Sequence, residues 1–196
     1  MLEEKNRLRA QIVSRLAAMF PDERDELSTE IAKRFVASLE FRGASVVLAY
    51  DSFGTEVNTH PLMQLILERG KALCLPKTRK KERSMTVHAV ADLQRDLTLS
   101  RWGFLEPKKT MPVVPLERID LIIVPGLAFD PQCHRLGRGA GYYDRFLPLV
   151  EVRAAACALA FECQIVEAVP VDEHDWPLQL IFTEERVIHA SAPLKK

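Results

Sequence analysis

The sequence has no surplus of charge of either sign, because 27 lysines and arginines are matched by 27 aspartates and glutamates among its 196 residues. Proteins that bind long nucleic acids usually carry a basic surplus, since neutralising phosphates supplies much of their affinity. With 47% hydrophobic and 28% charged residues, the composition is that of an ordinary globular protein. The charge balance therefore argues against a nucleic-acid partner, although a local basic patch stays compatible with it.

Cysteine is scarce, with four residues of which none forms a C-x-x-C pair. Their spacings match no common zinc pattern. We interpret them as small hydrophobic residues kept as thiols in a reducing compartment. They are Cys74, Cys133, Cys157 and Cys163.

Long hydrophobic runs are absent as well. The longest uninterrupted apolar run, Ala154 to Phe161, is far short of the roughly 20 residues that cross a bilayer. The N-terminus is charged from Glu3 onward and offers no apolar core of a secretory signal. These absences predict a cytoplasmic protein without a membrane partner.

What is present is an alternation of strand and helix patterns. Apolar residues recur at helical spacing from Leu8 to Met19 and again from about Asp22 to Leu39. Ala154 to Phe161 fits a buried strand or a helix, because its alanines leave both open. The expected strands are 44–50, 71–75, 85–90 (an edge strand), 120–124, 180–183 and 186–189, with further helices starting near Thr59 and at 142–150.

This alternation predicts a single domain over residues 1–196. Its expected fold class is α/β, a three-layer α/β/α sandwich with a mostly parallel, Rossmann-like sheet. Folds of this kind bind ligands at the carboxyl ends of parallel strands. The segments after Tyr50 and after Val124 lie there, so both are candidate sites.

The segment from Arg135 to Asp144, RLGRGAGYYD, is the strongest candidate. Its alternating glycines let the backbone approach an anion closely and turn N–H groups toward it. Arg135 and Arg138 add charge-assisted contacts to phosphate oxygens. Asp144 is placed to hold Mg²⁺ against those oxygens. We therefore interpret the segment as a phosphate-binding loop.

Neither standard nucleotide motif occurs in the chain. G-x-x-x-x-G-K-[ST] and G-x-G-x-x-G are both missing. A generic glycine-rich turn is the alternative interpretation. The flanking arginines, the paired tyrosines and the aspartate favour phosphate binding over it.

Several motifs in a fixed order resemble the 5-formyltetrahydrofolate cyclo-ligase family over nearly the whole chain. RLGRGAGYYDRFL resembles the family's glycine-rich signature, and four further segments resemble other family motifs. They are 5–9 (K-x-x-L-R), 51–59 (E-V-x-T), 101–107 (R-W-G-x-x-E-P) and 169–184 (H-D-x-P-L). The resemblance implies a Rossmann-like (NagB-like) fold. It also implies conversion of 5-formyltetrahydrofolate and ATP to 5,10-methenyltetrahydrofolate, ADP and phosphate with Mg²⁺, and we expect a monomer.

The resemblance also implies a role for individual residues. It predicts that Arg138 and Tyr142 are catalytic and that Asp144 and Asp175 bind Mg²⁺. ATP binding falls to Lys5, Arg9, Arg135, Gly137, Arg138, Gly139, Ala140, Gly141, Tyr142 and Tyr143. Folate binding falls to Asp51, Glu56, Trp102, Arg138, Gly139, Ala140, Gly141 and Tyr142.

Several of these residues also have plainer interpretations. Lys5 and Arg9 can form a solvated helix face, and Glu56 can be a loop carboxylate without a role. Tyr143 and Trp102 fit packing as well as function. Two positions depart from the family: Gln179 stands where an aspartate is common, and Ala140 where glycine or lysine is common. Alanine would strain the loop if its φ were positive.

The run Lys77 to Arg83, KTRKKER, carries five positive charges and one negative charge. It is either a solvated loop or a region that attracts the glutamate tail of polyglutamylated folates. Two other functions stay open: a folate-binding protein without turnover, suggested by Gln179, and a nucleic-acid module. The basic run has no interleaved aromatic residues, which disfavours the latter.

Overall fold

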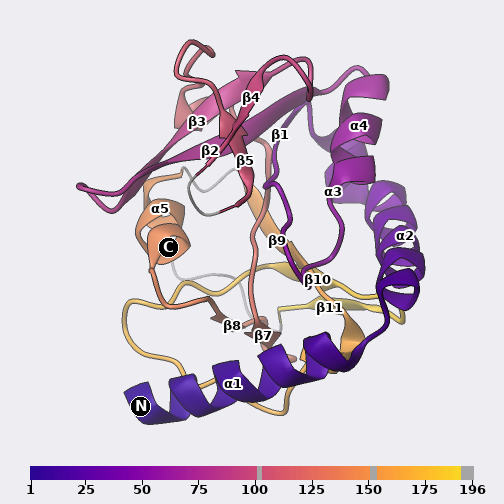
Figure 1. Cartoon of the computed structure of the whole chain (residues 1–196), viewed down its shortest axis with the longest axis vertical. Helices are drawn as coiled ribbons and strands as arrows, with labels where there is room; N and C mark the ends of the chain where they lie inside the picture. The colour runs from indigo at the N-terminus through magenta and orange to yellow at the C-terminus, as the bar shows by residue number, and fades with distance from the viewer. Residues whose placement is uncertain (101–102, 151–153, 191–196) are drawn as a thin grey trace.

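The computed structural model describes residues 1–100, 103–150 and 154–190 of the chain (Figure 1). The helices are α1 (Leu2–Ala18), α2 (Pro21–Ala37), α3 (Leu39–Gly43), α4 (His60–Glu68) and α5 (Tyr142–Phe146), with 3₁₀ turns at Leu116–Arg118, Leu147–Leu149 and Glu162–Gln164. The strands are β1 (Val46–Leu48), β2 (Ala72–Arg79), β3 (Ser84–Val90), β4 (Leu97–Leu99), β5 (Leu105–Pro107), β6 (Leu121–Ile123), β7 (Ala128–Phe129), β8 (Arg135–Leu136), β9 (Ala155–Leu159), β10 (Leu180–Phe182) and β11 (Val187–His189).

Seven strands form the central sheet in the order β11-β10-β9-β6-β1-β2-β3. β2, β1, β6, β9 and β10 run parallel, and β3 and β11 are antiparallel strands at the two edges. The predicted α/β fold with a mostly parallel sheet is therefore confirmed. Counted along the chain, the parallel strands have the order 2-1-3-4-5, which reverses between β1 and β6. Ligands of open α/β sheets bind at such a switch point.

Alternating side chains of the parallel strands supply two hydrophobic cores, one on each face of the sheet. Val47 and Leu121 pack in the core that also holds Ile12 and Phe35 of the N-terminal helices. Leu48 and its neighbours on the other face pack with Phe146 of α5. Figure 1 shows α2, α3 and α4 grouped on one side of the sheet and α5 on the other. The short strand pairs β4–β5 and β7–β8 lie outside the central sheet.

The two N-terminal helices follow the predicted apolar spacing, with Ile12, Leu16, Ile31 and Phe35 buried. Pro21 is tolerated at the start of α2, because the N–H groups of a helix's first turn have no hydrogen-bond partner within the helix. Within the described ranges no helix combines the length and apolar character of a membrane span.

Strand β2 continues past Pro76, where the sequence predicted its end. Ala72 N–H and Cys74 C=O bond toward β1, so by alternation Pro76 faces the same side. β1 has ended at Leu48, and its register with β2 stops at Cys74. The proline therefore removes no hydrogen bond from the sheet, which is why it is tolerated inside this strand.

The structure settles one segment that the sequence left open and shortens one predicted helix. Of the ambiguous run Ala154 to Phe161, residues 155–159 form a strand that is paired on both sides, with β6 and β10. The helix predicted over 142–150 is only α5, followed by a 3₁₀ turn containing Pro148. Pro148 has no N–H to donate to Asp144 O, which explains the early end of α5.

Candidate active site

A cavity of about 380 Å³ opens at the switch point between β1 and β6. One wall is the loop after β1 with Tyr50 to Glu56, and the other is the glycine loop from Arg135 to Asp144. The β2–β3 hairpin and the segment Phe104–Leu105 close it further. The lining residues are Tyr50, Asp51, Phe53, Glu56, Pro76, Thr78, Met85, Phe104, Leu105, Pro125, Gly126, Arg135, Gly137, Arg138, Ala140, Gly141, Tyr142, Tyr143 and Asp144.

The glycine loop leaves β8 and enters α5 through two left-handed backbone positions. Gly139 has φ +102° and Gly141 has φ +66°, conformations that glycine adopts without a steric penalty. Ala140, between them, is not among the residues with positive φ. The loop therefore accommodates alanine where the family commonly has glycine or lysine.

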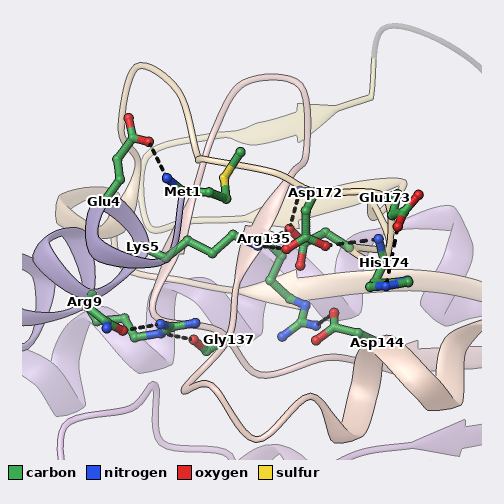
Figure 2. Close-up of polar contacts among 12 residues, drawn as sticks. Met1, Glu4, Lys5, Arg9, Arg135, Gly137, Asp144, Asp172, Glu173 and His174 are labelled. Carbon is green, nitrogen blue, oxygen red and sulfur yellow. Dashed lines mark hydrogen bonds and ion pairs between the residues drawn. The ribbon is translucent and has the colours of Figure 1, made fainter.

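Arg135 is the buried cation of the loop, with its side chain 3% exposed. Its guanidinium donates to Pro125 O at 3.2 Å and to Asp144 Oδ1 at the start of α5 (Figure 2). A Cβ on Gly137 would stand 2.7 Å from Arg135 Nη1, so glycine makes room for this pair. Arg135 thus ties the loop to α5.

Arg138 is the exposed cation of the loop, with its side chain 41% exposed. Its Nε and Nη2 both donate to Glu56 Oε1, at 3.0 and 2.9 Å. Its guanidinium lies 4.6 Å from the centre of the Phe53 ring. Burial raises the pKa of Glu56, although Arg138 and a bond from Phe53 N–H oppose the rise. The two predicted substrate-binding residues therefore meet across the mouth of the cavity.

The wall opposite Arg138 is aromatic, and Asp51 holds it in place. Phe53 and Phe104 have ring centres 5.5 Å apart. Asp51, with its side chain 4% exposed, accepts from Leu105 N at 2.6 Å. His60 Nε2 lies 2.7 Å from the other Asp51 oxygen, out of line for a hydrogen bond. Asp51 thus supports the wall, and direct contact with folate stays a prediction.

The paired tyrosines have different surroundings. The Tyr142 ring faces the guanidinium of Arg145 at 5.7 Å. The Tyr143 hydroxyl is buried without a hydrogen-bond partner among the described residues, and burial raises its pKa. Buried tyrosine hydroxyls are usually hydrogen-bonded. Since Tyr143 lines the cavity, both interpretations of it, packing and function, fit the structure.

Lys5 and Arg9 of the N-terminal helix do not line the cavity, and they make different contacts. Arg9 Nε donates to Gly137 O at 2.9 Å, so it reaches the loop. Lys5 Nζ instead contacts Asp172 at 2.7 Å and Asp175 at 2.5 Å (Figure 2). Burial lowers the pKa of Lys5, but the two carboxylates outweigh it and raise that pKa. Neither residue forms only a solvated helix face.

The two predicted metal ligands each face a cation in this structure. Asp144 pairs with Arg135, and Asp175 Oδ2 accepts from Lys5 and from Asp172 N at 2.8 Å. Among the described residues, no group of three or more His, Cys, Asp or Glu side chains is arranged to hold a metal. A shared Mg²⁺ between Asp144 and Asp175 therefore stays a prediction.

Gln179, the other departure from the family, lies directly before β10, at one end of that strand. Its side chain accepts from Ala156 N at 2.6 Å, and its backbone pairs with Ala156 and Ala190. It does not line the cavity. Gln179 therefore gives no support to the loss of turnover that the sequence left open.

The sequence reasoning missed several cavity residues. Phe53 and Phe104 were not singled out, and neither were Thr78 and Met85 of the β2–β3 hairpin. A signal existed for Phe53, which follows a strand end close to Glu56. For Asp172, the second partner of Lys5, the only signal was its position close to the H-D motif. Trp102, a predicted folate contact, lies outside the described residues.

Comparisons with known proteins match these features. Residues 1–184 match the model of the 5-formyltetrahydrofolate cyclo-ligase family. The chain belongs to this family. The 5-formyltetrahydrofolate cyclo-ligase of Escherichia coli K12 is 32% identical over 178 residues, covering 90% of this chain and 98% of that protein. The mouse cyclo-ligase is 30% identical over 190 residues, covering 92% and 94%.

Solved structures agree with this assignment. The NMR structure of Aquifex aeolicus 5,10-methenyltetrahydrofolate synthetase has a TM-score of 0.85 and 30% identity, covering 98% of this chain and 95% of that one. A 5,10-methenyltetrahydrofolate synthetase from Mycoplasma pneumoniae shares the fold, with a TM-score of 0.75 at 21% identity, covering 92% and 99%. The chain is thus a cyclo-ligase of folate metabolism, and the ATP-dependent cyclisation predicted from its motifs is the activity of its family.

Proposed function

We propose that this chain cyclises 5-formyltetrahydrofolate to 5,10-methenyltetrahydrofolate at the cavity between the β1 loop and the glycine loop. The observation that carries the proposal is the pairing of Arg138 with Glu56 across the cavity mouth, at 2.9 Å. It joins a cationic phosphate-type loop to a buried carboxylate in one space of about 380 Å³. ATP and the folate would meet there.

The folate ring would lie against the β1-loop wall. The Glu56 carboxylate is 7% exposed and suits the N–H donors on the polar edge of a pterin. Phe53 and Phe104 offer ring faces for stacking, and Asp51 holds their wall through Leu105 N. Arg138 would give up Glu56 to the substrate and turn to the formyl oxygen or a phosphate oxygen.

The triphosphate of ATP would lie along the glycine loop. Gly137, Gly139, Ala140 and Gly141 allow backbone N–H groups to approach its oxygens. Arg138 and Arg9 would add charge, and the buried Arg135 would hold the loop and the start of α5 in position. Tyr142 and Tyr143 would border the transferred phosphoryl group.

The chemistry then follows from the substrates. The formyl oxygen attacks the γ-phosphorus of ATP, ADP leaves, and the formyl carbon gains a phosphate leaving group. N10 attacks that carbon, closes the ring and expels phosphate, and the N10 proton is lost. The cavity contributes positioning and charge stabilisation, which dominate phosphoryl transfer. Arg138 is the residue that we place at the developing charge.

Mg²⁺ fits this arrangement best at Asp144, which lines the cavity beside Arg135. Carboxylates together with phosphate oxygens and waters are the ligands that Mg²⁺ prefers. The bound ion would neutralise charge on the phosphate oxygens. Asp175 is the second candidate ligand, and its Oδ2 is held by Lys5 and Asp172 N.

We also infer a cytoplasmic monomer made of one domain, which takes folates with more than one glutamate. All four cysteines are free thiols, as is usual in a reducing compartment. The basic β2–β3 hairpin beside the cavity is the feature that favours folates with a longer glutamate tail.

The decisive experiment incubates the purified chain with 5-formyltetrahydrofolate, ATP and Mg²⁺. We expect methenyltetrahydrofolate absorbance and ADP to appear in equal amounts, and neither to appear without ATP. Tight folate binding with no product would refute the proposed activity and leave a folate-binding protein. Replacing Mg²⁺ by a chelator should stop both products together.

A further inference from the structure

We propose that His60 is a positioning residue for the folate, which acts through the buried Asp51 on the aromatic wall of the cavity. His60 itself does not line the cavity. The proposal rests on the proposed function, because it concerns the wall against which the pterin would lie. It gives His60 the one Asp51 oxygen that is left without a hydrogen bond.

The carboxylate of Asp51 is only half satisfied by the wall that it supports. Its side chain is 4% exposed, and its Oδ2 accepts from Leu105 N at 2.6 Å. Its Oδ1 is buried and has no hydrogen-bond partner among the described residues. Burial raises the pKa of Glu56, and the charge of Asp51 adds to this rise, so two carboxylates lie close together here. Because a buried carboxylate oxygen without a donor is costly, Oδ1 needs one.

His60 is the donor within reach of this oxygen. Its Nε2 lies 2.7 Å from Asp51 Oδ1. At this separation an unprotonated ring nitrogen would point its lone pair at those of the carboxylate, so Nε2 carries the hydrogen. The His60 side chain is 47% exposed, and the second torsion of a histidine side chain is soft. A small rotation of the ring therefore brings the N–H into line with Oδ1.

The backbone holds His60 and Asp51 together. Thr59 precedes His60, the first residue of α4, and is fully buried. Its hydroxyl donates to Tyr50 O at 2.7 Å and accepts from Ser52 N at 3.0 Å. Thr59 N donates in turn to Ser52 Oγ at 3.0 Å. The start of α4 is thus tied to the residues on both sides of Asp51, so the contact with His60 is built into the fold.

Asp51 passes this support on to the segment that carries Phe104. Phe104 and Leu105 both line the cavity, and the Phe104 ring lies 5.5 Å from that of Phe53. The β4–β5 pair lies outside the central sheet, so side-chain bonds supply part of its attachment to the rest of the molecule. Without His60, the Asp51 carboxylate would turn its unpaired oxygen toward another donor. Leu105 N would then lose its acceptor, and the wall would lose its fixed position.

The test compares His60→Leu, which removes the donor, with His60→Gln, whose amide keeps a donor at similar reach. Calorimetry with 5-formyltetrahydrofolate in the absence of ATP measures binding, and steady-state kinetics measures KM and kcat. We expect His60→Leu to weaken folate binding and raise the folate KM roughly threefold to tenfold, as for the loss of one hydrogen bond. The KM for ATP and kcat should stay close to wild type, and His60→Gln should recover most of the affinity. The matched control is His189→Leu, at an exposed histidine of the edge strand β11, which should bind folate as the wild type does.

A double-mutant cycle with Asp51→Asn tests whether His60 acts through Asp51. In the Asp51→Asn background, His60→Leu should change the folate affinity little further. Additive effects would overturn the proposal, and so would equal folate affinity in the wild type and His60→Leu. Tighter binding in His60→Leu would overturn it too, because Oδ1 would then bind the folate directly. Absence of product from the wild type with ATP, while His60→Leu still weakens folate binding, refutes the proposed function alone.

Discussion

Arg135 and Arg138 lie three residues apart in one loop and each pairs with a carboxylate, yet their surroundings are opposite. The Arg135 side chain is 3% exposed, and the Arg138 side chain is 41% exposed. A charge taken out of water costs several kcal/mol unless it stays paired, so Arg135 depends on its partner Asp144. A solvated arginine can exchange partners at little cost. The comparison sets a buried, structural arginine beside a solvated one, to which we assign the substrate under the proposed function.

The largest expected effect comes from Arg138→Ala. We expect kcat to fall on the order of 10³-fold, because a charged donor at the developing charge is lost. The free energy of unfolding should fall by less than in Asp144→Ala. Arg138 itself is solvated, and the buried Glu56 that remains keeps its bond from Phe53 N–H and, with its raised pKa, takes up a proton more readily. Steady-state kinetics and urea unfolding of the same preparation measure both. Arg138→Lys, which keeps the charge but not the forked geometry, should lie in between. A large loss of stability would end the distinction between the two arginines.

The converse test is Asp144→Ala. It leaves the buried Arg135 guanidinium without its carboxylate, so the free energy of unfolding should fall by about 3 kcal/mol. Activity should fall too if Asp144 holds Mg²⁺. Urea unfolding measures the loss, with Glu173→Ala as control, because that side chain is 86% exposed. Wild-type stability of Asp144→Ala would mean that Arg135 does not need this partner.

Glu56→Gln sharpens the comparison from the side of the second carboxylate. We expect KM for the folate to rise roughly 10-fold to 100-fold, since a charged hydrogen-bond acceptor is lost. Burial raises the pKa of Glu56. Protonation of Glu56 removes the charged acceptor, so the wild-type KM should increase as pH falls. This increase should begin at a higher pH than it would for an ordinary glutamate, whose pKa is about 4.3. The KM of Glu56→Gln should not increase in this way as pH falls. If wild type and variant showed the same dependence of KM on pH, Glu56 would not be its cause.

The smallest expected effect is that of Gly137→Ala. The added Cβ would stand 2.7 Å from Arg135 Nη1, so the guanidinium must shift within its buried site. We expect a loss of about 1 kcal/mol in unfolding free energy and little change in KM. Gly43→Ala is the control, because its Cβ would meet nothing within 4 Å. If both variants had the same free energy of unfolding, the close packing of Gly137 against Arg135 would not contribute to stability.

Much of the fold followed from local patterns. The parallel sheet, the edge strand from Met85 to Val90 and the two N-terminal helices were predictable, because periodicity and β-branched runs report which side of an element is buried. Pro76 was misjudged as a strand end. Whether a proline disrupts a strand depends on its neighbour, and β1 stops before reaching it.

The sequence offered candidate site residues, but it could not predict the contacts between them. Glu56 and Arg138 are 82 positions apart, and Lys5 and Asp175 are 170 apart. Nothing local in the chain indicates such pairs. Motif resemblance indicated that these residues belong to one site, and the tertiary structure decided that Lys5 contacts Asp172 and Asp175 whereas Arg9 reaches the glycine loop.

By itself the sequence determined the α/β class, the position of the glycine loop between a strand and a helix, and the membership of its motifs in one family. These properties depend on residue spacing, which the chain carries along its length. Only the tertiary structure decided which arginine is buried, what each carboxylate pairs with, and that the basic run extends from the cavity mouth. Burial and charge pairing are set by segments far apart in sequence, brought together where the strand order reverses between β1 and β6.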